Sequence, residues 1–228
     1  MVDSVALLSG GLDSSTLAYH LVKGQNKTVH FLSFYYGQRH ARELQAARFI
    51  AQDLEQKHDI IYIDNETHDF LRGPGATSLT NPEVEVPDGH YAEETMKATI
   101  VPNRNAIMLS VAFGVAISDQ APEVAFGAHA GDHYIYPDCR PEFILAFQHA
   151  MLLGNDNKVL LYSPFEASTK ADIVRLGFDL SVPLHKTWSC YKGRLRHCGT
   201  CGTCTERIEA FRLAKVPDPT TYEEVHTA

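Results

Sequence analysis

The stretch Ser4-Val5-Ala6-Leu7-Leu8-Ser9-Gly10-Gly11-Leu12-Asp13-Ser14-Ser15 decides the fold, because two glycines cut off a short apolar run and a helical pattern follows. Val5 to Leu8 has the length of a buried strand, and apolar residues then recur with helical spacing from 13 to 22. A strand, a glycine turn and a helix N-terminus point several backbone N–H groups at one spot, where the helix dipole adds partial positive charge. The stretch therefore predicts a site for phosphate or pyrophosphate.

The residue types of this loop suit an anion. Gly10 and Gly11 let the backbone close on it without a Cβ in the way. Asp13 is placed to hold a magnesium ion that the phosphates share. Hydroxyl donors stand at Ser9, Ser14 and Ser15. A structural connector is the alternative, because Gly-Gly turns before helices are common and this loop matches neither the Walker A motif nor the dinucleotide fingerprint.

Apolar strands alternate with helical patterns along the rest of the chain, which predicts a doubly wound, five-stranded parallel sheet in a Rossmann-like α/β fold. The expected strands are 5–8, 27–36, 59–63, 123–127 and 159–163. The expected helices are 13–22, 41–54, 106–118, 141–153 and one that opens at 168–172 with Ser168 as its cap. Ligands of such sheets lie where the strand order reverses, so we expect 9–15, 36–39, 129–132 and Lys170 to meet in one crevice.

Two segments stand out from this alternation. Residues 72–100 are rich in glycine, proline, threonine and acidic residues. A loop of this length is usually functional or disordered, and we expect a mobile lid over the substrate in preference to disorder. The helix expected at 106–118 has little polar face, so it is buried against the sheet or in a subunit interface.

Four of the five cysteines cluster near the C-terminus with seven, two and two residues between them, at Cys190, Cys198, Cys201 and Cys204. In a cytosolic chain this favours a metal over disulfides, and four thiolates suit tetrahedral Zn²⁺. An iron–sulfur cluster or a redox pair is the alternative. Four ligands leave no open position, so we expect a structural zinc in a segment 186–228 that packs on an α/β domain 1–185. We expect the remaining Cys139 to be a packed thiol.

The bulk composition narrows the classes of function. The chain has 228 residues, 44% of them hydrophobic, and a net charge of -8. No stretch approaches the ~20 apolar residues of a membrane span, and the first strand leaves no room for a signal peptide, so we expect a cytoplasmic protein. The negative charge argues against direct binding of nucleic acid, although basic residues gather between 186 and 215.

Taken in order, these motifs resemble the 7-cyano-7-deazaguanine synthase family of the PP-loop N-type ATP pyrophosphatases, whose fold is adenine nucleotide alpha hydrolase-like. The similarity extends over nearly the whole chain. The first motif is shared with many pyrophosphatases, whereas the ordered set is specific. The matching segments are Ser9–Ser14, Tyr36–His40, Val101–Asn105, Tyr136–Arg140, Lys170–Asp172 and the four cysteines.

The resemblance implies that ATP drives the conversion of 7-carboxy-7-deazaguanine and ammonia to 7-cyano-7-deazaguanine, a step of queuosine and deazapurine biosynthesis. The carboxylate is adenylated, ammonia displaces AMP to give an amide, and a second activation dehydrates the amide. The alternative is an enzyme that stops at the amide or passes the activated carboxylate to another amine, such as a protein N-terminus. Sulfur transfer to tRNA and a non-enzymatic nucleotide-binding module are more distant alternatives.

The same resemblance implies roles for individual residues. ATP is held by Leu8, Ser9, Gly10, Gly11, Leu12, Asp13, Ser14, Ser15, Arg39 and Lys170. Asp13, Lys170 and Arg104 are the expected catalytic residues, and Lys170 neutralises charge that builds up on the departing pyrophosphate. Arg39 and Arg104 are candidates to pair with phosphate or with the substrate carboxylate.

The flat base needs contacts of its own. Tyr36 or a residue of the lid is expected to stack on the purine, and Asp132 or Asp138 to read its amidine edge. A homodimer is expected from the family and from the apolar helix 106–118. The chain departs from the family at Asn103, where glycine is common, and at 133–135, where we expect the bulkier Tyr134 and Ile135 to reshape the pocket or the channel for the acceptor.

Overall fold

The apolar strand at the start of the chain lies at the centre of the sheet. In the computed structural model, which describes residues 1–63, 77–156 and 158–223, β1 (Ser4–Leu7) lies between β2 (Val29–Tyr35) and β4 (Glu123–Ala125). The edge strands are β3 (Lys57–Tyr62) and β5 (Leu160–Tyr162), and the order is β3-β2-β1-β4-β5. Every neighbouring pair is parallel, so the predicted parallel sheet is confirmed, with shorter strands than expected at β2, β4 and β5.

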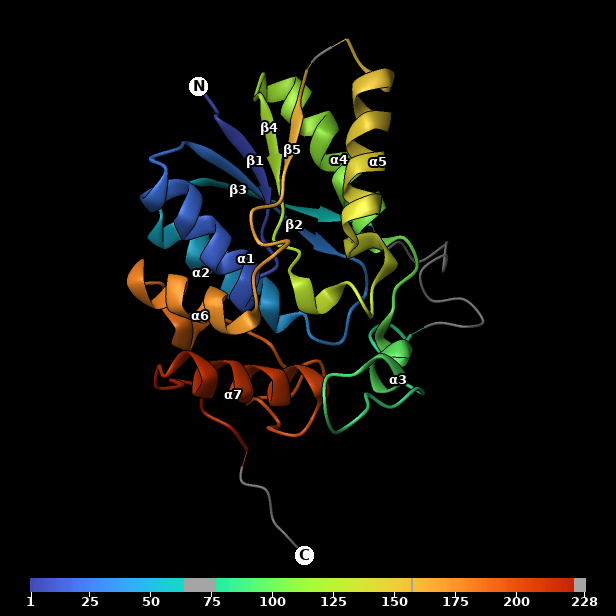
Figure 1. Ribbon diagram of the computed structural model, residues 1–228, viewed down its shortest axis with the longest axis vertical. Coiled ribbons are helices and arrows are strands. Elements are labelled where there is room, and N and C mark those ends of the chain that lie inside the picture. Colours follow the sequence, from blue (N-terminus) through green and yellow to red (C-terminus); the bar gives the residue numbers. More distant parts are fainter. Residues whose placement is uncertain (64–76, 157, 224–228) are drawn as a thin grey trace, which may run out of the picture.

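Helices cover both faces of this sheet (Figure 1). On one face lie α1 (Leu12–Tyr19), α2 (Arg42–Asp53) and α6 (Lys170–Asp179), and on the other lie α4 (Arg104–Asp119) and α5 (Pro141–Gly154). The short helix α3 (Glu93–Met96) precedes α4, and the C-terminal α7 (Gly202–Ala214) packs on α6, away from the sheet. The two-sided winding predicted from the alternation is therefore confirmed, whereas α7 has no counterpart in the sequence prediction.

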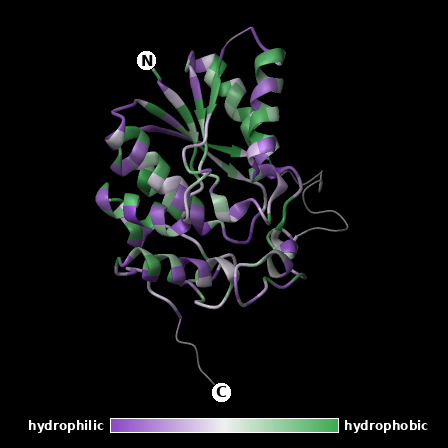
Figure 2. Ribbon diagram, viewed as in Figure 1, coloured by the Kyte–Doolittle hydropathy of each residue, from purple (hydrophilic) through white to green (hydrophobic). Residues whose placement is uncertain are grey.

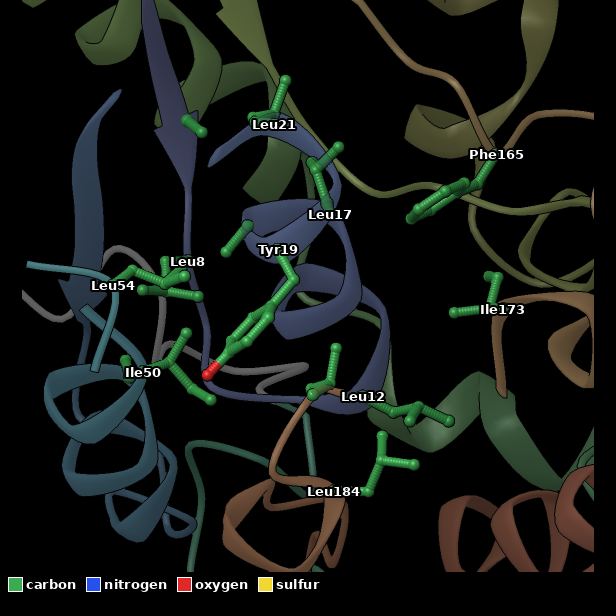
Figure 3. Close-up of a cluster of buried hydrophobic side chains, with 14 of the residues drawn as sticks. Leu8, Leu12, Leu17, Tyr19, Leu21, Ile50, Leu54, Phe165, Ile173 and Leu184 are labelled. Carbon is green, nitrogen blue, oxygen red and sulfur yellow. The ribbon is translucent and has the colours of Figure 1, made fainter. Parts of the chain in front are cut away.

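A core of aliphatic and aromatic side chains joins α1, α2 and α6 to the sheet (Figure 3). The apolar side of α2 and of the residue after it is buried, at Leu44, Ala47, Ile50, Ala51 and Leu54. Fully burying one such leucine or isoleucine contributes about 1.5–3 kcal/mol to folding. This packing fixes α1, and with it the loop that precedes α1, against the centre of the sheet.

Helix α4 packs on the opposite face with only part of its surface. Leu109, Ala112, Phe113 and Ala116 are buried, and much of the rest of α4 and α5 is apolar (Figure 2). One stretch, Lys97–Asp119, is long and apolar enough to pass for a membrane span by length and hydropathy alone, with 28% of its most apolar window buried. Its helix α4 contacts β1 and β4, as a core helix does.

The described part of the predicted lid, residues 77–100, packs onto its surroundings. Leu79, Met96 and Thr99 are buried, and Asp88 pairs with the backbone of Cys201 in an isolated bridge. Gly89 N–H donates to the Thr200 carbonyl at 2.8 Å. Positions 72–76 of the predicted lid lie outside the described residues. The segment 77–100 therefore packs on the core beside the sheet and also contacts the C-terminal segment that carries the four clustered cysteines, called the cysteine segment below.

The cap predicted for α6 is displaced by one residue. Thr169, not Ser168, is the N-cap, and its Oγ1 accepts from the Asp172 N–H at 3.2 Å. The Asp172 carboxylate in turn accepts from the Thr169 N–H at 3.0 Å, which completes a capping box. This cap places Lys170 in the first turn of α6, where its side chain reaches the central crevice.

Candidate active site

A cavity of about 210 Å³ lies at the carboxyl ends of β1, β2 and β4, where the strand order reverses. Ten of the residues predicted to form the site line it: Leu8, Ser9, Gly11, Leu12, Asp13, Ser14, Tyr36, Arg104, Asp132 and Lys170. They come from the β1–α1 loop and the start of α1, the end of β2, the first turns of α4 and α6, and the segment after β4. The fold thus brings them together as expected, and their individual roles stay predictions.

The hydroxyl groups of the loop between β1 and α1 form hydrogen bonds within the loop. Ser9 Oγ and Ser14 Oγ lie 2.9 Å apart, and the Gly11 N–H donates to Ser9 Oγ at 3.3 Å. Gly10 has φ +83°, and a Cβ built there would lie 2.1 Å from the Glu43 carbonyl oxygen of α2. Only glycine therefore lets the loop turn this tightly against α2.

Substitution of this glycine tests the close approach. Gly10→Ala is expected to lower the free energy of unfolding by about 2–5 kcal/mol, from the left-handed φ and the overlap with α2. Gly114→Ala, in the middle of α4, is the control, because the added Cβ would meet no atom within 4 Å apart from its chain neighbours and the backbone of its own helix. It is expected to raise stability by about 1 kcal/mol through helix propensity. Equal effects of the two substitutions in urea unfolding would contradict the geometry.

Lys170 is the centre of a buried charge cluster. Its Nζ lies 2.6 Å from Asp13 Oδ2, 3.3 Å from Glu206 Oε2 and 3.3 Å from His129 Nε2. Burial alone would lower the pKa of Lys170, but Asp13 and Glu206 outweigh it and raise that pKa. Burial likewise opposes the ionisation of Asp13, yet Lys170 and His129 hold the pKa of Asp13 below its usual value. Both groups are therefore charged at neutral pH.

One oxygen of this cluster has no partner. Asp13 Oδ1 is buried and accepts no hydrogen bond from the described residues, while Oδ2 is taken by Lys170. A buried carboxylate oxygen without a donor is costly unless a cation completes it. Carboxylate oxygen is the ligand type that Mg²⁺ prefers. The donor set at Asp13 therefore fits the magnesium ion that the sequence predicts.

The opposite wall of the cavity is aromatic and carries one guanidinium. Arg104, in the first turn of α4, lies with its Cζ 5.8 Å from the ring centroid of Tyr136. Tyr36 and Tyr191 line the same wall. Burial raises the pKa of Tyr36 to about 12, so its hydroxyl stays protonated. A cation surrounded by flat rings suits a planar ligand that bears a carboxylate.

Asp132 is held in place from the segment 77–100. The Tyr91 hydroxyl donates to Asp132 Oδ1 at 2.9 Å, and both residues line the cavity. Asp132 Oδ1 also lies 3.5 Å from His129 Nε2. The orientation of this carboxylate is thus fixed by two neighbours before any ligand binds.

Four predicted site residues do not line the cavity: Gly10, Ser15, Arg39 and Asp138. Ser15 is fully buried within α1. The Arg39 guanidinium donates to the Asn81 carbonyl at 2.7 Å. Asp138 accepts from the Asn105 N–H at 2.8 Å, so it satisfies a free donor at the start of α4. Direct contact of Arg39 or Asp138 with substrate gains no support from these positions.

The departures from the family pattern have mild consequences. Asn103 adopts the left-handed conformation, with φ 52°, which asparagine tolerates better than most residues other than glycine. Tyr134 is 76% exposed and Ile135 packs in the core, and neither lines the cavity. Tyr134 and Ile135 therefore do not shape the lining of this cavity, because one points outward and the other into the hydrophobic core, and an effect on a channel for the acceptor stays a prediction.

The four clustered cysteines form a candidate metal centre. The Sγ atoms of Cys190, Cys198, Cys201 and Cys204 all lie within 4.8 Å of one another, and all four residues are buried. The neighbouring His197 is not part of this cluster, because its Nε2 accepts a hydrogen bond from the Ser189 N–H at 3.0 Å. Burial also lowers the pKa of His197 to about 4, which keeps the ring neutral. Four thiolates without an open position fit a structural metal.

Several cavity residues were missed by the sequence prediction. Tyr91 lies in the irregular segment 77–100, and Trp188, Ser189, Tyr191, Thr203 and Glu206 belong to the cysteine segment. Neither segment has a periodic pattern that assigns a side chain to the crevice. The clustered cysteines gave the one available signal, because a segment that packs on the α/β domain can bring side chains near its crevice, but they did not say which residues reach it.

Comparison with known proteins assigns the chain to a family. A model of the family described as queuosine biosynthesis protein QueC matches residues 3–215. The chain belongs to this family. It is 55% identical over 225 residues to the 7-cyano-7-deazaguanine synthase of Rhizobium meliloti (strain 1021), covering 97% of this chain and 92% of that relative.

A second relative of this chain has the same name. The 7-cyano-7-deazaguanine synthase 1 of Mesorhizobium japonicum is 51% identical, covering 98% of this chain and 94% of its own. The family predicted from the ordered motifs is therefore confirmed. Among solved structures, an NMN synthetase from Francisella tularensis has a TM-score of 0.48 at 18% identity, covering 80% of this chain and 63% of its own.

Proposed function

We propose that this protein makes 7-cyano-7-deazaguanine from 7-carboxy-7-deazaguanine, ammonia and ATP. The observation that carries the proposal is the membership of a family whose relatives bear the name 7-cyano-7-deazaguanine synthase at more than half identity over nearly the full chain. The cavity supplies the rest of the argument, because its two walls suit the two substrates separately.

The wall formed by the β1–α1 loop suits ATP. Backbone N–H groups at the N-terminus of α1 and the hydroxyls of Ser9 and Ser14 face the cavity beside Lys170. These are donors and a fixed positive charge, which stabilise the pyrophosphate as it leaves the α-phosphorus. Asp13 Oδ1 would hold the Mg²⁺, which when bound neutralises the charge of the phosphates.

The aromatic wall suits the deazapurine acid. Arg104 would pair with the 7-carboxylate and orient it toward the ATP-binding loop, and Tyr36 would pack on the ring. Asp132, already oriented by Tyr91, would accept N–H bonds from the amidine edge. This arrangement brings the carboxylate oxygen to the α-phosphorus, where the C–O–P bond forms and the bond to pyrophosphate breaks. Ammonia then adds to the acyl carbon, and AMP departs.

The product distinguishes the nitrile synthase from its alternatives. Mass spectrometry of an incubation with ATP, Mg²⁺, ammonium and 7-carboxy-7-deazaguanine is expected to show AMP and the nitrile. Because each activation consumes one ATP, two AMP are expected per nitrile. AMP with the amide alone would favour the enzyme that stops there, and acyl transfer to an added peptide amine would favour a protein acceptor.

We propose that the four thiolates bind Zn²⁺ and that residues 186–228 are a metal-binding segment packed on a domain 1–185. The close grouping of the Sγ atoms supports the first part, and the packing of α7 on α6 supports the second. We also propose a cytoplasmic location, where thiols stay reduced and ATP is available.

We propose a homodimer through the apolar surface of α4, α5 and β5. Leu145 and Leu153 on α5 are 71% and 77% exposed, and Leu160 on β5 is 58% exposed. Adjacent exposed leucines of this kind mark interaction surfaces. The wild type is expected to be a dimer in light scattering, and Leu153→Glu a monomer. Phe178→Glu, at an equally apolar but separate position on α6, should stay dimeric. A monomeric wild type would contradict the proposal.

A further inference from the structure

Glu206 is the one carboxylate that the cysteine segment sends into the cavity, among the described residues that line it. It stands in the first turns of α7, two residues after Cys204, and its side chain is 14% exposed. The thiol cluster holds the beginning of this helix. The position of Glu206 relative to the ATP-binding loop is therefore set by the metal centre and by the packing of α7 on α6.

Glu206 contacts the same cation as Asp13. Its Oε2 lies 3.3 Å from Lys170 Nζ, and its Oε1 lies 3.8 Å from His129 Nε2. Asp13 Oδ2 lies 2.6 Å from Lys170 Nζ on the other side. Lys170 is thus shared between a carboxylate of α1 and a carboxylate of α7.

This sharing matters because Asp13 has two tasks. It pairs with Lys170, and its free Oδ1 fits a magnesium ion. A carboxylate that turns to a divalent cation weakens its hold on a lysine. A buried lysine that loses its only anionic partner is strongly disfavoured. A second carboxylate removes this conflict, because Lys170 keeps one anionic partner while Asp13 binds the metal.

We propose that Glu206 is a positioning residue that holds Lys170 toward the phosphates, which frees Asp13 for Mg²⁺. The inference rests on the proposed function only in taking the cavity as a magnesium pyrophosphate site. It gives the metal centre a defined task, since the cysteine cluster fixes the helix that carries Glu206.

The test measures binding of magnesium pyrophosphate by calorimetry at a series of Mg²⁺ concentrations, without any deazapurine. Glu206→Gln is expected to raise the Mg²⁺ concentration for half-maximal binding about tenfold, the effect of losing one charged hydrogen bond. Glu206→Asp keeps the charge, and its Mg²⁺ concentration for half-maximal binding is expected to lie between those of the wild type and Glu206→Gln. Glu209→Gln, on the same helix but 60% exposed, should equal the wild type.

A double-mutant cycle separates positioning from simple loss of negative charge. In a Lys170→Gln background, Glu206→Gln is expected to have no further effect, because it acts through Lys170. An equal rise in both backgrounds would overturn the proposal, as would unchanged binding in Glu206→Gln. Loss of bound zinc or of thermal stability in Glu206→Gln would also overturn it, since the role would then be structural.

The outcome also separates this inference from the proposed reaction. Failure of the wild type to bind magnesium pyrophosphate would overturn both. Binding with the expected Glu206 and Lys170 pattern, but without a nitrile product, would uphold the role of Glu206 and reject the synthase.

Discussion

An enzyme in which asparagine replaces Asp13 is expected to form AMP at least about a thousandfold more slowly than the wild type. The substitution removes the nearer of the two carboxylate partners of Lys170 and the carboxylate oxygen that fits Mg²⁺. Loss of one preorganised electrostatic contact costs about a hundred- to a thousandfold in rate, and this residue supplies two. The measurement is the initial rate of AMP release at saturating ATP and 7-carboxy-7-deazaguanine.

The fold is expected to survive this substitution, because Lys170 keeps Glu206 as a partner. Asp3→Asn is the matched control. Asp3 lies at the opposite end of β1, where its carboxylate accepts from the Thr28 N–H at 2.8 Å. Its AMP release should stay within twofold of the wild type. A rate within tenfold of the wild type for Asp13→Asn would remove Asp13 from the catalytic residues.

Replacing Cys201 by serine is expected to abolish metal binding and to unfold the C-terminal segment. The Sγ atoms form one compact cluster in a buried core, and structural zinc sites of this type contribute about 10–16 kcal/mol of binding energy to folding. Metal content should fall from one zinc per chain to near zero. Because Trp188, Tyr191 and Glu206 belong to this segment, the active-site cavity should open and AMP formation should fail as well.

Cys139→Ser is the control for this prediction. Cys139 is buried between Asn105 and the aromatic wall, away from the other thiols, and it should leave the zinc content unchanged. Zinc retained at one per chain in Cys201→Ser would contradict the four-thiolate site. Iron and sulfide in place of zinc in the wild type would favour the cluster alternative.

The sequence alone was sufficient for the parts of the fold that obey simple periodicities. Val5 to Leu8, the two glycines and the helix after them specify the first strand and the loop, and the alternation of strands and helices predicts parallel pairing. The strand order and the central position of β1 come from the structure. The cysteine spacing was sufficient to predict the thiol cluster, because three short intervals bring four thiols together. These features depend on residues that are close together in the sequence, so short stretches of the sequence are enough to predict them.

The contributions to the cavity from distant segments could not be read in this way. Glu206 and Arg207 are charged residues in a short helix, which indicates a solvent-facing surface. In the fold, Arg207 is 1% exposed and donates to Thr187 and to the Leu184 carbonyl, and Glu206 reaches Lys170. Tyr91 lies in a segment without periodicity. Long-range packing decides all three positions.

The central claim is that the carboxylate of the deazapurine attacks ATP at the α-phosphorus. The most direct test uses 7-carboxy-7-deazaguanine with ¹⁸O in both carboxylate oxygens, followed by mass spectrometry of the AMP. Adenylation of the acid and then of the amide transfers one ¹⁸O to each AMP and leaves none in the nitrile. AMP without ¹⁸O, formed while the acid is consumed, would contradict the account.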